Sequence, residues 1–121
     1  MSKVLIVEDS KTALAMLTDM FEDDGFEVIT ATDGVDGLEA AKRERPDLVV
    51  MDLNLRRVSG KEVCAALKGD DNYRNMKIVM FTDQTNIIDE LDLRNAGVDL
   101  YLHKQTGPDE LLDHVRELLK E

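Results

Sequence analysis

Five short apolar runs rich in β-branched residues recur along the chain, and the segments between them follow a different period. The runs are residues 4–7, 26–29, 48–51, 78–81 and 98–102. Four of the five are almost continuously apolar, which is typical of parallel strands that are covered on both faces. We therefore predict five short parallel strands.

Between these runs the apolar residues recur with the period of a helix, which places them on one stripe in each segment. The five stripes are Ala13, Leu14, Leu17, Met20 and Phe21; Val35, Leu38 and Ala41; Val63, Cys64 and Leu67; Ile87, Ile88 and Leu91; and Leu111, Leu112, Val115, Leu118 and Leu119. Each stripe predicts a helix that packs its apolar side on the sheet.

Glycines and prolines stand where these helices should begin and end. Gly25 and Gly97 follow helical segments at positions where a left-handed cap is expected. Pro46 closes the second helix, because the residue before a proline avoids helical dihedral angles. Pro108 suits the first turn of the last helix.

Five strand–helix units in a row predict an α/β fold, a doubly wound five-stranded parallel sheet with helices on both faces. The expected strand order is 2-1-3-4-5, with a ligand crevice at the carboxyl ends of the first and third strands. At 121 residues the chain is expected to form a single domain over 1–121. Functional side chains should therefore follow strands one, three, four and five.

Composition narrows the classes of function. The chain has 15 Lys and Arg against 26 Asp and Glu, a net charge of −11, which disfavours binding to nucleic acid or to a membrane surface. Aromatic residues make up 4%, so the core must be aliphatic. Cys64 is the single cysteine and cannot form an internal disulfide, and every apolar run is far shorter than the ~20 residues of a membrane span. We expect a soluble, cytoplasmic protein.

Polar side chains follow the strands at the predicted crevice: Glu8 and Asp9, Asp52, Thr82, and His103 with Lys104. Carboxylates that share one crevice repel each other unless a cation is present. Because the available ligand atoms are all oxygens, the expected cation is Mg²⁺. An Asp can take up a phosphoryl group, and Asp52 lies centrally among these residues. A lysine and a threonine nearby could bind the phosphoryl oxygens.

The sequence resembles the receiver domain of two-component response regulators over its whole length. The matching residues are Glu8-Asp9, Asp52 within Met51-Asp52-Leu53-Asn54-Leu55, Gly60, Thr82, Tyr101 and Lys104. This resemblance implies a flavodoxin-like fold. It also implies a phosphoacceptor switch, rather than an enzyme in the ordinary sense, that assists its own phosphorylation and dephosphorylation.

The resemblance also implies a role for each residue. Asp9 and Asp52 would ligate Mg²⁺ through their carboxylates, Asn54 through its backbone carbonyl, and Glu8 through a bound water. Lys104 would hold a phosphoryl oxygen, Thr82 would move to bond the phosphoryl group, and Tyr101 would rotate inward behind it. Asn54 and Gln84 match positions that influence the rate of dephosphorylation.

Partners are implied in the same way. The phosphoryl group would come from a histidine kinase or a phosphotransfer protein in a phosphorelay. The signal would pass to a downstream protein through the fourth helix, the fifth strand and the fifth helix, around Tyr101. The chain ends with the fifth helix, as expected of a stand-alone switch or of a fragment of a larger regulator.

Three departures from the family pattern carry predictions of their own. Arg56 stands where Pro is common, and we interpret it and Arg57 as solvated cations. Asp83 stands where a small residue is usual, either facing water or hindering Thr82. Gln105 replaces a Pro that is typically preceded by a cis bond. Because a cis bond before another residue costs roughly 3–4 kcal/mol, we predict a trans bond and a displaced Lys104. His103 is interpreted as an exposed strand-end residue.

Asp83 and Gln105 support an alternative function, a pseudo-receiver that acts as an interaction module without phosphorylation. Two further classes fit poorly. A flavodoxin-like cofactor binder needs a Ser, Thr or Gly phosphate loop where this chain has Glu8-Asp9. A phosphatase with an Asp nucleophile needs a second Asp where this chain has Asn54.

Overall fold

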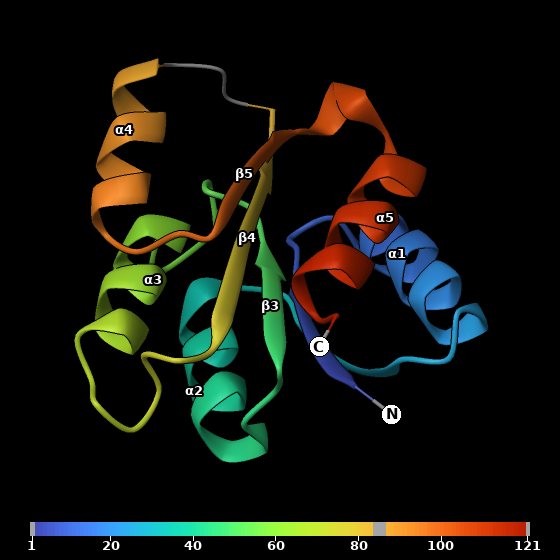
Figure 1. Ribbon diagram of the computed structural model, residues 1–121, viewed down its shortest axis with the longest axis horizontal. Coiled ribbons are helices and arrows are strands. Elements are labelled where there is room, and N and C mark those ends of the chain that lie inside the picture. The colour runs from blue at the N-terminus through green and yellow to red at the C-terminus, as the bar shows by residue number, and fades with distance from the viewer. Residues whose placement is uncertain (1, 84–86, 121) are drawn as a thin grey trace.

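The computed structural model describes residues 2–83 and 87–120, and it shows a central sheet between two layers of helices (Figure 1). The sheet has five parallel strands in the order β2-β1-β3-β4-β5, which confirms the predicted topology. The strands are β1 (Lys3–Val7), β2 (Glu27–Ala31), β3 (Leu48–Met51), β4 (Lys77–Thr82) and β5 (Leu100–His103).

Helices cover both faces of the sheet, as predicted. Two of them, α1 (Lys11–Asp23) and α5 (Pro108–Leu118), lie on one side of the sheet in Figure 1. On the other side lie α2 (Gly34–Glu44), α3 (Gly60–Lys68) and α4 (Ile87–Asn95). A short 3₁₀ helix, η1 (Lys104–Thr106), connects β5 to α5. In the described part of the chain no helix is long and apolar enough to cross a bilayer.

Alternate residues of β1 supply two apolar clusters, one on each face. Leu5 and Val7 pack on the side of α2, α3 and α4, whereas Val4 and Ile6 pack toward α1 and α5. This is the two-residue period of a strand with both faces buried. The sheet is therefore a rigid platform, and the groups that follow its strands are held at fixed separations.

The buried face of α2 differs from the predicted stripe. Val35 and Leu38 are only half-buried, while Gly34, Gly37 and Ala40 are buried beside Ala41. A Cβ on Gly37 would lie 2.9 Å from the Val7 side chain. Small residues let this helix approach β1 more closely than larger side chains would allow. The hydrophobic period correctly placed Ala41 and Leu38 toward the core, but it missed the buried glycines of the inner face.

One more apolar prediction was wrong. In α4 the structure buries Leu93 completely and leaves Leu91, a member of the predicted stripe, 54% exposed. The side chains of Ile87 and Ile88, which the stripe included, lie outside the described part of the chain.

The predicted helix boundaries are confirmed. Gly25 and Gly97 have φ of 94° and 103°, in the region that favours glycine. Arg45 ends α2 with a left-handed φ of 47°, directly before Pro46. Pro108 occupies the first turn of α5.

Cys64 on α3 is fully buried, and burial raises the pKa of its thiol from 9.0 to about 11. The thiolate fraction at mildly alkaline pH is then about 100-fold lower than for an ordinary thiol, in addition to the steric barrier. We expect the native protein to react with DTNB at least about 100-fold more slowly than the chain unfolded in guanidinium. Rapid labelling of the folded protein would contradict this assignment.

Candidate functional site

The side chain of Glu8 lies directly after β1 and is only 5% exposed. Its two carboxylate oxygens have different partners. Oε1 accepts from the Lys104 ammonium at 2.6 Å, and Oε2 accepts from the Ser10 backbone N–H at 3.1 Å. Glu8 is therefore held between the start of α1 and the end of β5.

Asp52 follows β3, the strand that pairs with β1. Its Oδ2 lies 2.8 Å from the Lys104 Nζ, and its Oδ1 accepts from the Asn54 backbone N–H at 3.1 Å. The side chain is 14% exposed, so it remains open to solvent at the carboxyl end of the sheet. The lysine thus joins the ends of β1 and β3 at one point.

The Lys104 ammonium remains charged in this position. Burial disfavours its charged form, but the hydrogen bonds and charges of Asp52 and Glu8 outweigh that effect. The pKa of Lys104 consequently lies above its ordinary value of 10.5. The site therefore holds a permanent cation across the physiological pH range.

Asp9 has the one buried side-chain oxygen or nitrogen that lacks a hydrogen-bond partner among the described residues, its Oδ1. An unpaired buried carboxylate oxygen is costly unless a cation or a donor satisfies it. The other oxygen, Oδ2, lies 3.9 Å from Nε of Arg56, a side chain that is 69% exposed. A hard cation that takes oxygen ligands fits this position, with Asp9 and Asp52 as the residues that would hold it.

The carboxylates do not form a finished metal centre by themselves. In the ranges that the structure describes, no three His, Cys, Asp or Glu side chains are grouped so as to hold a metal ion. Both carboxylate oxygens of Glu8 already accept hydrogen bonds, one from Lys104 and one from the Ser10 backbone N–H. Ligation by Asn54 and the water-mediated role of Glu8 stay predictions.

Two residues on β4 and β5 lie behind these groups. Thr82 is fully buried at the end of β4, and Tyr101 on β5 is 9% exposed and packs in the cluster on the side of α3 and α4. The Tyr101 ring is therefore already inside the protein in this structure. Their roles as switch residues stay predictions.

The loop between β3 and α3 is fixed against the start of α2. Gly34 donates its N–H to the Arg56 carbonyl at 3.0 Å, and Arg57 donates to the Asp33 carboxylate at 3.1 Å. The backbone N–H of Asp36 and the Arg57 guanidinium hold the pKa of Asp33 below its usual value. Arg57 is 59% exposed, in agreement with its interpretation as a solvated cation, and it also pairs with Asp33. Gly60 closes the loop, because a Cβ there would lie 2.4 Å from the Asp52 carbonyl oxygen.

The remaining departures have mixed outcomes. The described residues contain no cis peptide bond, which confirms a trans Lys104–Gln105 bond. Lys104 nevertheless reaches Asp52, so the predicted displacement was wrong. Asp83 is exposed, as one of its two interpretations requires, and Gln84 lies outside the described residues. His103 is half-buried and bonded through both ring nitrogens, which its interpretation as an exposed residue missed.

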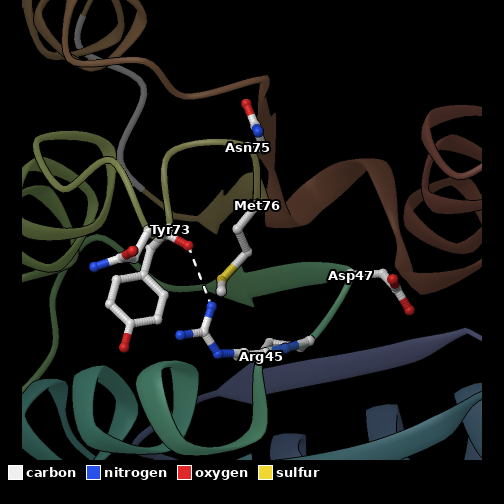
Figure 2. A pocket seen from close by; sticks show the side chains of 7 residues that line it. Arg45, Asp47, Tyr73, Asn75 and Met76 are labelled. Atoms are coloured by element: carbon white, nitrogen blue, oxygen red, sulfur yellow. Dashed lines mark hydrogen bonds between the residues drawn. The ribbon is translucent and has the colours of Figure 1, made fainter.

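A separate surface hollow lies at the opposite end of the sheet, before β3 and β4 (Figure 2). Its wall includes the Arg45 guanidinium, which lies 4.9 Å from the centre of the Tyr73 ring and donates to the Asn72 carbonyl at 3.3 Å. These contacts fasten the end of α2 to the loop before β4. The hollow shares no residue with the acidic site.

The arrangement defines a class: a flavodoxin-like α/β domain with an acidic site and one lysine at the carboxyl ends of its central strands. Residues 4–116 match the family model of the response regulator receiver domain. The chain belongs to the response regulator receiver domain family of two-component systems.

Known response regulators are similar to this chain over nearly its whole length. The polar-differentiation response regulator DivK of Brucella anthropi is 33% identical over 116 residues, which cover 96% of this chain and 94% of DivK. A CheY-like receiver domain protein from Methanospirillum hungatei has a TM-score of 0.92 at 28% identity, covering 98% and 94% of the two chains. The Mn²⁺-bound form of response regulator Rcp1 has a TM-score of 0.83 at 25% identity, covering 98% and 91%.

Proposed function

We propose that Asp52 accepts a phosphoryl group from a phosphohistidine of a histidine kinase or phosphotransfer protein, in a reaction that depends on Mg²⁺. The observation that carries this proposal is the contact of Lys104 with Asp52 at 2.8 Å, next to the unpaired Oδ1 of Asp9. A carboxylate that can act as a nucleophile, a fixed cation and an oxygen that requires a cation are together at the carboxyl end of the sheet. The Mn²⁺-bound form of the related Rcp1 supports a divalent cation in a domain of this family.

The chemistry follows from these groups. A carboxylate oxygen of Asp52 attacks phosphorus and the P–N bond of the phosphohistidine breaks. The donor's imidazole, protonated on its other nitrogen, keeps the electron pair of that bond and leaves as the neutral ring. Lys104 would then turn from the carboxylate of Asp52 to an oxygen of the transferred group, while Glu8 keeps the ammonium in place. A divalent cation bound by Asp9 and Asp52 would neutralise the added negative charge. Water later hydrolyses the acyl phosphate.

Transfer of the signal would use the elements behind the site. Thr82 would move toward the phosphoryl group and Tyr101 would follow it, which alters the face formed by α4, β5 and α5. A downstream protein would bind at this face, and we place the exchange in the cytoplasm. The domain would act as a switch that assists its own phosphorylation and dephosphorylation.

Intact mass spectrometry after incubation with Mg²⁺ and acetyl phosphate tests the proposal. We expect one phosphoryl adduct on the wild-type chain and none on Asp52→Ala. The matched control is Asp71→Asn, which alters a carboxylate in the loop before β4 with an 86% exposed side chain, and it should be phosphorylated like the wild type.

The same experiment separates the alternative function. An unmodified wild-type chain under these conditions would refute phosphorylation and favour a pseudo-receiver interaction module. An adduct that persists in Asp52→Ala would instead place the acceptor at another residue.

A further inference from the structure

The His103 side chain connects two segments that follow neighbouring strands. Thr82 and His103 are paired across β4 and β5, so the residues after them leave the sheet side by side. Nε2 of His103 lies 2.8 Å from the Asp83 carbonyl oxygen, and Nδ1 accepts from the Gln105 backbone N–H at 3.0 Å. The imidazole therefore joins Asp83, the residue directly after β4, to the turn that carries Lys104.

These two contacts require one particular tautomer of the His103 ring. Nδ1 must be an acceptor because it faces an N–H, and Nε2 must carry the proton because it faces a carbonyl. The neutral ring with hydrogen on Nε2 is the one form that satisfies both. We use the term His103 bridge for the contacts of this ring with Asp83 and Gln105.

The bridge depends on Gln105, where the family pattern has Pro. Proline has no backbone N–H and could not donate to Nδ1. The base of the bridge is fixed a second time, because the Thr106 hydroxyl donates to the His103 carbonyl at 2.8 Å. The turn therefore holds the ring in place, and the ring in turn holds the Asp83 carbonyl.

The direction of this restraint follows from the strand order. β4 lies between β3, which carries Asp52, and β5, which carries His103. Movement of Thr82 toward Asp52 shifts the adjoining Asp83 away from β5 and lengthens its bond to His103. We infer that His103 is a positioning residue that holds Asp83 on the β5 side and so opposes the switch movement of Thr82. This inference rests on the proposed phosphorylation of Asp52.

Two variants separate the two arms of the bridge. In His103→Asn the side-chain oxygen can still accept from the Gln105 N–H, as in an Asx turn, but the chain is too short to reach Asp83. In His103→Gln the longer amide can keep a donor near the Asp83 carbonyl. We expect His103→Asn to raise the initial rate of phosphorylation by acetyl phosphate roughly five-fold, the effect of one net hydrogen bond. His103→Gln should remain within about two-fold of the wild type.

The rate is measured by intact mass over time, and the direction of its change is diagnostic. A merely structural role for His103 would lower the rate in both variants, because a destabilised site binds its substrates less well. Equal rates in the wild type and His103→Asn, or a lower rate in His103→Asn, would overturn the inference.

Nitrogen-15 NMR of the ring tests the bridge independently of phosphorylation. The unphosphorylated wild type should show a protonated Nε2 and an unprotonated Nδ1, and phosphorylation should shift the Nε2 signal as the Asp83 bond lengthens. A ring with hydrogen on Nδ1 would refute the bridge itself. If the NMR agrees but the wild type takes up no phosphoryl group, the proposed function fails, and the restraint on switching fails with it.

Discussion

Replacing Lys104 with Met is expected to lower the initial rate of Asp52 phosphorylation by acetyl phosphate about 100-fold, as loss of one preorganised charge at a reacting group does. The ammonium lies 2.8 Å from Asp52 and 2.6 Å from Glu8, so it is already in position before a phosphoryl group arrives. Methionine has a similar length but offers no charge to the phosphoryl oxygens. Intact mass over time, at fixed Mg²⁺, measures the rate.

Cation binding provides the internal control for this variant. Removal of the ammonium leaves the carboxylates of Glu8 and Asp52 without their partner, so the variant should bind Mn²⁺ at least as tightly as the wild type, measured by electron paramagnetic resonance. Lys61→Met is the matched control, because Lys61 is half-exposed on α3 and pairs with Asp92. A wild-type rate in Lys104→Met would show that the lysine has no part in the transfer.

Replacing Gly34 with Ala is expected to destabilise the fold by about 3 kcal/mol or more. The added Cβ would lie 1.7 Å from the Val58 carbonyl oxygen and 2.6 Å from the Val58 carbonyl carbon. The obstacle is backbone, so the loop between β3 and α3 must shift, and the Gly34 N–H bond to the Arg56 carbonyl must lengthen. Urea unfolding followed by circular dichroism measures the loss as a lower midpoint with an unchanged slope.

Glu39→Ala tests whether the effect is specific to this contact. Glu39 is exposed on the same helix, so the substitution should alter the free energy of unfolding by less than about 0.5 kcal/mol. Equal stability of Gly34→Ala and the wild type would mean that the loop between β3 and α3 relaxes freely and that the start of α2 does not fix the position of this loop.

The arrangement of strands could be predicted from the sequence because, in a small α/β domain, a short continuous apolar run such as residues 48–51 is typical of a strand that is buried on both faces. The acidic site followed from the same pattern. Once the strand order is known, residues that follow neighbouring strands must lie together, and Asp52 and Lys104 do. The topology, more than any single residue, made the site predictable.

The errors arose where distances decide the outcome. The hydrophobic period did not select Gly37, which the close approach of α2 to β1 requires, or Gly34, which lies against Val58 in the loop between β3 and α3. Hydrophobicity alone does not report how near two backbones come. Leu93, and not Leu91, is buried for a related reason, since a one-turn helical stripe leaves its orientation on the sheet undefined.

The hydrogen-bond partners of the side chains in the site also could not be predicted from the pattern of residue types. The sequence placed Glu8 near the cation through a bound water, a role that stays a prediction, but it did not indicate the bond that Glu8 accepts from Lys104. The replacement of Pro by Gln105 suggested a displaced lysine, but the 3₁₀ turn after β5 brings the ammonium to Asp52 with a trans bond. A local turn geometry thus compensated for a substitution that appeared disruptive in the sequence.

The contact between Glu8 and Lys104 joins residues 96 positions apart, almost the whole length of the chain. During synthesis Asp52 leaves the ribosome long before Lys104, which pairs with it. A nascent chain therefore carries the acidic groups without their cation until the last strand has been made and has docked beside β4. Under the proposed function, competence to receive a phosphoryl group would thus be tied to completion of folding, and an incompletely made or partly folded chain would not divert phosphoryl groups from its donor.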